Sequence, residues 1–216
     1  KSKSVQPWFC YLPFNAPHFP TAGNKRPGQP NIWQAPDWAF KAIGLLPKET
    51  DPKKRYDAVV YAMDKAIGRV LAALDKAGTA NNTFVFFMSD NGGFRLGRKG
   101  LDVGLNTPLR HGGVTCWEGG LRVPCIVRAP GRVPAGVTSD LVTATIDLMP
   151  TIATLAGAEI PTDRVLDGLD VSKIWHGEQV KLDFVEFFRK HITVHGCGRS
   201  TKAQVERVLG LMAEGK

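Results

Sequence analysis

Asp90 and Asn91 stand side by side in the segment Ser-Asp-Asn-Gly-Gly, directly after an apolar run at 83–88. Carboxylate and amide oxygens are hard ligands, which suit Ca²⁺ or Mg²⁺. Since ligands of open α/β sheets bind just past the carboxyl ends of the strands, this position favours a metal-binding role. The alternative is a plain turn, because Asn-Gly after an apolar run is also typical of a hairpin.

His18 is the second candidate for chemistry. It lies in a loop at 13–20, after a nearly all-apolar stretch at 5–12, and Pro17 and Pro20 stiffen that loop by fixing their own φ angles. A histidine held in a rigid loop at the end of a strand suits acid–base catalysis or anion binding. The alternative is an ordinary surface histidine.

Three elements must position these groups. The runs at 5–12 and 83–88 predict strands, the second buried on both faces. Between them, apolar residues recur at three- and four-residue steps over 52–77, which predicts an amphipathic helix. Asp51 is its expected N-cap and Gly78 its stop signal. Strand, helix and strand form a β-α-β unit, so we predict an α/β fold with a mostly parallel or mixed sheet flanked by helices.

The rest of the chain predicts smaller elements. A third strand is expected at 123–128 and a short strand at 140–145, and Asp147 is expected to cap a helix at 148–156 that Gly157 ends. Also expected are a long loop with one helical turn at 21–50, a turn at 167–170, a short helix to Trp175, an edge strand at 184–188 and a capped amphipathic helix after 201.

The composition is that of a globular protein, since 43% of the 216 residues are hydrophobic. The net charge of +8 is spread along the chain without a nucleic-acid-binding module, so nucleic acid is not a predicted partner. The charge fits attraction to small anions or acidic polymers, or simply a basic soluble surface. No apolar run approaches the length of a membrane span, and no signal peptide is visible.

The four cysteines form no Cys-x-x-Cys pair and no cluster with histidine at zinc spacing. Cys10 and Cys125 lie in apolar runs, which predicts buried thiols. The first residue is Lys1, and an apolar run follows almost at once, so we expect the chain to be part of a longer protein.

Seven short motifs follow one another along the chain. They are Asn-Ala-Pro-His at 15–18, Ala-x-Asp-Lys-Ala-Ile-Gly-Arg-Val at 62–70, Ser-Asp-Asn-Gly-Gly at 89–93, Trp-Glu-Gly-Gly-Leu-Arg-Val-Pro at 117–124, Ala-Pro-Gly at 129–131, Ile-Asp-Leu-Met-Pro-Thr-Ile-Ala-Thr-Leu-Ala-Gly at 146–157 and Asp-Gly-Leu-Asp at 167–170. Each motif alone is weak, but their order resembles the sulfatase family, in particular its arylsulfatase branch within the alkaline-phosphatase-like superfamily.

The resemblance implies an α/β sandwich that hydrolyses sulfate esters at the carboxyl edge of its sheet. It implies that Asp90 and Asn91 are two ligands of a single Ca²⁺, and that His18 lies beside the sulfate and the leaving-group oxygen. It also implies a formylglycine nucleophile, formed within a Cys-x-Pro-Ser-Arg or Ser-x-Pro-x-Arg motif. Sulfatases of this kind are commonly periplasmic, lysosomal or secreted, and this sequence does not choose among these compartments.

Three departures from the family pattern matter. Neither nucleophile motif occurs in the 216 residues. The paired aspartates that complete the family's metal shell are also absent, so we expect both features upstream and expect this chain alone to be inactive. The family's sulfate-binding lysine falls on Gly113, which leaves Arg110, His111 or Lys99 as candidates to bind the substrate. Beyond about residue 190 no match to the family continues.

We therefore predict an incomplete sulfatase catalytic domain at 1–189 and an unmatched tail at 190–216 with a short amphipathic helix. The predicted partner is a sulfate ester, with a sulfated glycan as one form. One alternative is a non-catalytic relative that binds sulfated glycans, which Gly113 and the net charge of +8 favour. Another is a phosphate or phosphonate monoester hydrolase of the same fold, which we disfavour because such enzymes place more His and Asp ligands around two metals.

Overall fold

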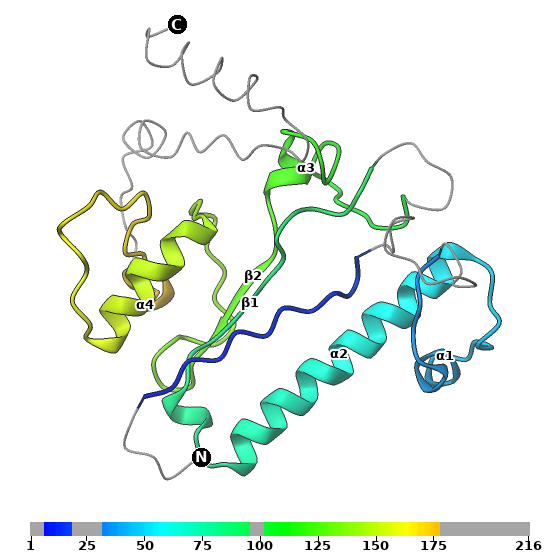
Figure 1. The fold of residues 1–216 in the computed structure, drawn as a ribbon, viewed down its shortest axis with the longest axis horizontal. Coiled ribbons are helices and arrows are strands. Elements are labelled where there is room, and N and C mark those ends of the chain that lie inside the picture. The colour runs from blue at the N-terminus through cyan, green and yellow to red at the C-terminus, as the bar shows by residue number, and fades with distance from the viewer. Residues whose placement is uncertain (1–6, 19–31, 96–101, 178–216) are drawn as a thin grey trace, which may run out of the picture. The chain divides into compact units, whose positions relative to one another are not determined.

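A computed structural model describes residues 7–18, 32–95 and 102–177 of the chain, which divides into two compact units. The first unit comprises 1–83 and 88–125, and the second comprises 84–87 and 126–216. The elements in chain order are α1 (Asp37–Ala42), α2 (Pro52–Lys76), η2 (Ala80–Asn82), β1 (Val85–Met88), α3 (Glu118–Leu121), β2 (Cys125–Arg128), η3 (Thr145–Asp147), α4 (Leu148–Ala156) and α5 (Ser172–Trp175) (Figure 1).

Helix α2 is the longest element of the first unit, and its signals were correctly predicted. The Asp51 carboxylate accepts the backbone N–H of Lys54 at 3.0 Å, which satisfies one of the unpaired donors at the helix start. Pro52 occupies the first helical position, where its missing N–H costs nothing. Beyond the last turn, Gly78 adopts a φ of +67°, a conformation that glycine takes without a steric penalty.

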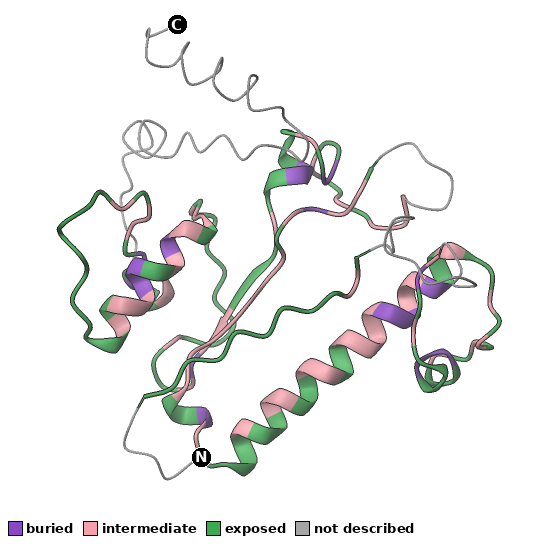
Figure 2. Cartoon of the chain, viewed as in Figure 1, coloured by how far each residue is buried: buried purple, intermediate pink, exposed green. Residues whose placement is uncertain are grey.

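The core of the first unit gathers around the start of α2. Arg55 is buried there, and its guanidinium donates to the carbonyl oxygens of Trp33 at 2.6 Å and Glu49 at 2.8 Å. The same guanidinium lies over the ring of Phe40, 4.9 Å from its centroid. Figure 2 shows the buried residues on α1 and on the first turns of α2. Arg55 therefore holds the segment around α1 against the helix that follows it.

The second unit contains a two-stranded sheet of β1 and β2. The predicted strands at 83–88 and 123–128 are confirmed in shorter form. The prediction that the first is buried on both faces is wrong, because every residue of β1 is only half-buried. Trp175 of α5 packs on this sheet, with its ring 4.7 Å from that of Phe86.

Asp147 joins two of the recognised motifs inside the second unit. It was expected to cap α4, but its side chain makes no capping hydrogen bond to that helix. Its carboxylate instead accepts the N–H groups of Ala144 at 2.7 Å and Leu169 at 2.8 Å, and Asp147 is only 1% exposed. The nearby Thr151 hydroxyl accepts the N–H of Val171 at 2.9 Å. The motif at 146–157 is therefore joined to the segment 167–171 by hydrogen bonds to the buried side chains of Asp147 and Thr151.

Several sequence predictions are wrong in the part of the chain that the structure describes. Of the strand expected at 5–12, the described residues 7–12 form no strand, and none forms at 140–145. An extended segment becomes a strand only when a neighbour pairs with its backbone groups, and the described ranges provide no partner for 7–12. Cys10 and Cys125 are exposed rather than buried. The apolar residues of the first segment are exposed with them, namely Trp8, Phe9, Tyr11, Leu12 and Phe14.

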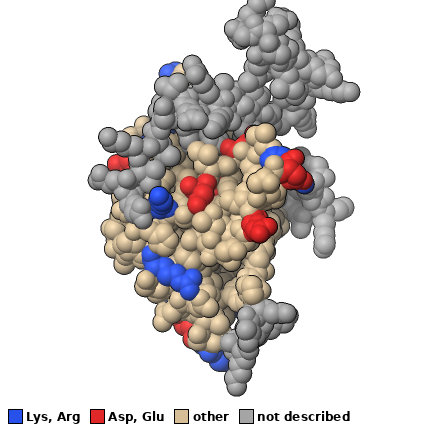
Figure 3. All heavy atoms as spheres, turned by 90° about the vertical axis from the view of Figure 1, so that its left-hand side faces the viewer, with Lys and Arg blue, Asp and Glu red and all other residues tan. Residues whose placement is uncertain are grey.

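The predicted strand at 184–188, the helix after 201 and the boundary at 189 lie outside the described residues. Within the described ranges, no helix is long and apolar enough to cross a membrane. On the face drawn in Figure 3, the described basic and acidic side chains occur in small, interspersed groups.

We expect Asp147→Ala to lower the free energy of unfolding by about 3 kcal/mol, because it removes the buried carboxylate that accepts two partly buried N–H groups. Urea denaturation followed by circular dichroism measures the change. Asp163→Ala is the matched control, since Asp163 is exposed and pairs only with its neighbour Arg164 in a surface ion pair. Equal midpoints for the two variants would show that the Asp147 hydrogen bonds do not support the fold.

Candidate active site

The segment 89–93 follows β1 and belongs to the first unit. The Ser89 hydroxyl donates to the carbonyl oxygen of Asn91 at 2.8 Å, which closes a tight turn around Asp90. Asp90 is exposed and Asn91 is half-buried. The turn therefore presents a solvent-accessible carboxylate next to a partly shielded amide.

Backbone hydrogen bonds between glycines join this turn to the segment 110–120. The N–H of Gly92 donates to the carbonyl oxygen of Gly120 at 3.0 Å, and the N–H of Gly113 donates to that of Gly93 at 2.9 Å. Phe94 and Gly113 form an isolated parallel bridge. A Cβ atom on Gly92 would lie 1.8 Å from the carbonyl oxygen of Gly119, so no larger residue fits there without moving the backbone.

Gly113, where the sequence analysis expects the family lysine, has no room for a side chain. A Cβ atom there would lie 2.4 Å from the carbonyl oxygen of Gly92, 2.6 Å from Cδ1 of Phe94 and 3.0 Å from Oδ1 of Asn91. The absence of a lysine is therefore built into the backbone packing.

His18 lies against the same bridge. Its backbone N–H donates to the carbonyl oxygen of Asn15 at 2.8 Å, and the Trp33 indole N–H donates to that of Pro17 at 2.7 Å, which anchors the loop. The His18 ring meets the Phe94 ring edge to face, with centroids 5.8 Å apart. Contacts thus run from His18 to Phe94, and both Phe94 and Asn91 border the backbone of Gly113.

Arg110 and His111 form a basic and aromatic cluster with Trp117. The Arg110 guanidinium carbon lies 3.7 Å from the centroid of the Trp117 ring, a close cation–π contact. The His111 ring stacks on the same indole, with the two ring centroids 5.8 Å apart and an angle of 20° between the ring planes. Both basic residues are exposed. Arg110 and His111 were predicted from the sequence, but their shared contact with Trp117 was not; Lys99 lies outside the described residues.

Asn106 was not predicted from the sequence, yet its side-chain amide bonds to both the 89–93 turn and the 110–120 segment. A single asparagine in a loop is a weak signal, because its hydrogen-bond partners, Gly93 and His111, can be recognised only once the loops have met.

The donor set at the turn fits a hard cation only in part. Asp90 and Asn91 supply two oxygen ligands, whereas Ca²⁺ takes six to eight. Among the described residues, no group of three or more His, Cys, Asp or Glu side chains is arranged to hold a metal ion. These two residues therefore suit one side of a metal shell that other ligands complete.

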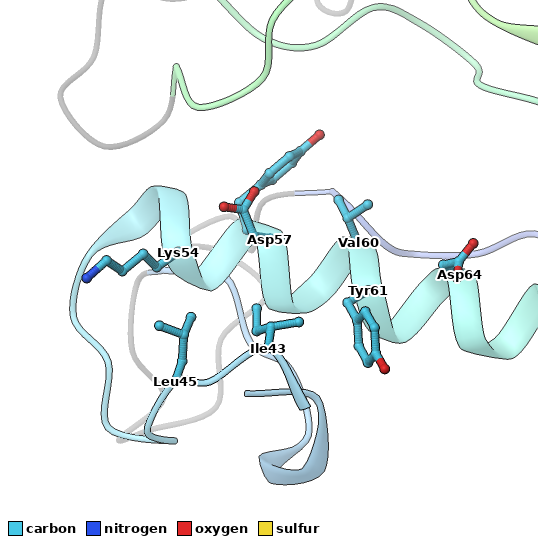
Figure 4. A pocket seen from close by; sticks show the side chains of 8 residues that line it. Ile43, Leu45, Lys54, Asp57, Val60, Tyr61 and Asp64 are labelled. Atoms are coloured by element: carbon cyan, nitrogen blue, oxygen red, sulfur yellow. The ribbon is translucent and has the colours of Figure 1, made fainter. Parts of the chain in front are cut away.

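A groove of about 670 Å³ lies elsewhere in the first unit, along α2 (Figure 4). It is lined by Ile43, Leu45, Lys54, Tyr56, Asp57, Val60, Tyr61 and Asp64. Burial raises the pKa of the Tyr56 phenol. None of the recognised loops at 15–18, 89–93 or 117–124 lines this groove, so we do not assign the chemistry to it.

Gly113→Ala tests the glycine packing. We expect the free energy of unfolding to fall by about 1–3 kcal/mol, because the new methyl group meets the backbone of Gly92. Gly68→Ala is the matched control, since no atom lies within 4 Å of a Cβ at this position in α2, and we expect it to stabilise the helix by about 0.5–1 kcal/mol. Chemical denaturation compares the two, and a Gly113→Ala protein as stable as the control would refute the packing.

Comparison with known proteins shows what the chain resembles. The family model described as Sulfatase matches residues 1–158. Steryl-sulfatase of Rattus norvegicus is 46% identical over 125 residues, which are 56% of this chain and 22% of that protein. A protein named Sulfatase from Formosa agariphila is 36% identical over 203 residues, covering 87% of this chain and 33% of that protein.

Solved structures agree with these relatives. The crystal structure of Ps i-CgsB in complex with k-i-k-neocarrahexaose is 33% identical, with a TM-score of 0.66 over 86% of this chain and 35% of that one. The structure of PsFucS1 sulfatase from Pseudoalteromonas sp. has a TM-score of 0.51 at 30% identity, over 63% of this chain and 26% of that one. The chain thus spans between about a fifth and about a third of the length of these relatives. Its fold is part of the α/β, alkaline-phosphatase-like fold, and the chain belongs to the sulfatase family.

Proposed function

We propose that the whole protein, meaning the longer chain that contains these 216 residues, is a sulfatase of the arylsulfatase type that hydrolyses sulfate monoesters with Ca²⁺. The observation that carries this proposal is the contact of the His18 ring with Phe94, 5.8 Å between centroids, beside the turn of Asp90 and Asn91. The motifs at 15–18, 89–93 and 117–124, which are far apart in the sequence, come together there around the closely packed backbones of Gly92, Gly113 and Gly119. The membership of the sulfatase family supports the same reaction.

The residues of this chain have distinct roles in the proposal. Asp90 and Asn91 would hold one side of a Ca²⁺ ion, which supplies positive charge to the sulfuryl oxygens when bound. The His18 imidazole donates a proton to the leaving-group oxygen as the S–O bond breaks. Arg110 and His111 bind the anionic substrate in place of the lysine that Gly113 excludes.

The nucleophile of the proposed reaction is not in this chain, because the 216 residues contain neither formylglycine motif. A formylglycine outside these residues would supply it. The chain spans only about a third of its longer relatives, and the exposed apolar segment 7–14 supports additional chain that covers it. We therefore propose that 1–189 is part of a catalytic domain, with 190–216 as a separate tail.

Sulfated glycans are the substrate class that we propose. The similar structure of Ps i-CgsB contains k-i-k-neocarrahexaose, an oligosaccharide. The N-acetylgalactosamine-6-sulfatase of Canis lupus familiaris, 40% identical over 131 residues that are 61% of this chain and 25% of that protein, is named for a sugar sulfate. The exposed Arg110, held on Trp117, and the net charge of +8 suit an anionic glycan.

A non-catalytic, sulfated-glycan-binding relative is the second candidate. The lack of space for any side chain at Gly113 favours it, because a family cation is excluded there. Salt-sensitive binding of a sulfated glycan without turnover by the whole protein supports this candidate over the hydrolase.

Asp90→Asn in the whole protein tests the metal role. We expect kcat/KM for an aryl sulfate to fall by about 100-fold or more, since a charged ligand is lost and such donors contribute about 3 kcal/mol to transition-state stabilisation. Calorimetric titration should show weaker Ca²⁺ binding. Asp64→Asn is the control, because Asp64 is an exposed residue of α2. Unchanged Ca²⁺ affinity in Asp90→Asn would remove the turn from the metal site.

The isolated 216-residue chain should not hydrolyse an aryl sulfate, with or without Ca²⁺, because it lacks the nucleophile and part of the metal shell. Spectrophotometric assay of released phenol in the chain and in the whole protein makes the comparison. Ca²⁺-dependent turnover by the chain alone would contradict the proposal that its site is incomplete.

A further inference from the structure

We propose that Asn106 is a positioning residue that couples the proposed metal-binding turn to the proposed anion-binding segment. The inference rests on the proposed function, and it deepens it by assigning the residue that fixes two halves of the site against each other. Asn106 touches neither substrate nor metal in this proposal. It acts through the backbone of Gly93 and His111.

The geometry of the Asn106 amide is the basis of the assignment. Its Oδ1 atom accepts the backbone N–H of Gly93 at 3.0 Å, and its Nδ2 group donates to the carbonyl oxygen of Gly93 at 2.8 Å. The same Nδ2 group donates to the carbonyl oxygen of His111 at 3.0 Å. The Asn106 side chain thus pairs with the N–H and the carbonyl oxygen of Gly93 in one loop, and with the carbonyl oxygen of His111 in the other.

Only an amide of this length satisfies all three partners. A carboxylate accepts but does not donate, so it would face two carbonyl oxygens without a proton between them. The approach also needs a glycine beside it, because a Cβ atom on Gly112 would lie 2.6 Å from Nδ2. Gly93, Gly112 and the Asn106 side chain are therefore packed directly against one another.

The two partners of Asn106 stand next to the proposed functional groups. Gly93 follows Asn91 by two residues, and His111 adjoins Arg110. His111 has a φ of +58°, a conformation that non-glycine residues seldom adopt and that needs support from its surroundings. Loss of the Asn106 amide should therefore displace the metal ligands and the anion-binding side chains together.

The test compares Asn106→Ala and Asn106→Asp with Asn81→Ala in the whole protein. Asn81 is an exposed residue of η2 and serves as a matched asparagine control. Three quantities are measured: the Kd for Ca²⁺ by calorimetry, kcat and KM for an aryl sulfate, and amide hydrogen exchange of the segments 91–94 and 110–113. The exchange experiment is run on metal-free protein, so that it does not depend on the proposed function.

We expect both Asn106 variants to raise the Kd for Ca²⁺ by about 10- to 100-fold, as loss of an outer-shell partner does in metal sites. Exchange should accelerate in both segments and not across the rest of the protein. Asn106→Asp should be no better than Asn106→Ala, because its carboxylate repels the two carbonyl oxygens. We also expect both Asn106→Ala and Arg110→Ala to raise KM. In the double variant, the combined effect on KM should be smaller than the product of the two single fold-changes, because both residues act on the segment 110–113.

Two results would overturn the inference. One is that the Asn106 variants keep the Kd for Ca²⁺ of the unmodified protein, counted per folded molecule, and also keep its amide hydrogen exchange in the segments 91–94 and 110–113. The other is faster exchange throughout the protein in proportion to lost stability, which indicates a purely structural role. Absence of Ca²⁺ binding by the unmodified protein would refute the proposed function instead, and the metal-free exchange measurement would still decide whether Asn106 joins the two segments.

Discussion

The close approach of glycine backbones is the constraint on which the candidate site depends. Gly92 lies so near Gly119 that a Cβ atom would stand 1.8 Å from a carbonyl oxygen, and a Cβ atom on Gly113 would stand 2.4 Å from the carbonyl oxygen of Gly92. This packing lets backbone N–H and carbonyl groups of two distant loops bond directly. It brings the turn of Asp90 and Asn91 beside the segment of Arg110, and it does so by excluding side chains, including any cation at Gly113.

Polar side chains provide the remaining hydrogen bonds that fix these loops. Asn106 pairs with the backbone of Gly93 in the first unit, and the buried carboxylate of Asp147 accepts two N–H groups in the second. In both places a side chain satisfies loop backbone that no helix or strand satisfies, which keeps irregular segments in a defined conformation. Family motifs can therefore have different purposes: the one at 89–93 suits chemistry, whereas those at 146–157 and 167–170 support the fold.

Local signals in the sequence were sufficient for some elements and not for others. Helix α2 was predicted because its cap, its apolar periodicity and Gly78 all lie within the helix or next to it, and α4 was predicted for similar reasons. The strand predicted at 5–12 was wrong for the described residues 7–12, because strand formation depends on a partner that local sequence does not reveal. Asp147 was assigned as a cap because residue type indicates that role, yet its partners come from Ala144 and Leu169. Asn106 was missed because its hydrogen bonds exist only after two loops have met.

The most direct test of the account is a crystal structure of the whole protein with Ca²⁺ and a sulfate ester analogue, with the metal located by anomalous scattering. We expect one ion with the Asp90 carboxylate and the Asn91 amide oxygen at about 2.3–2.6 Å, and the His18 ring facing the bound sulfuryl group. A metal bound elsewhere, with Asp90 and Asn91 left in solvent as an ordinary turn, would contradict the central claim.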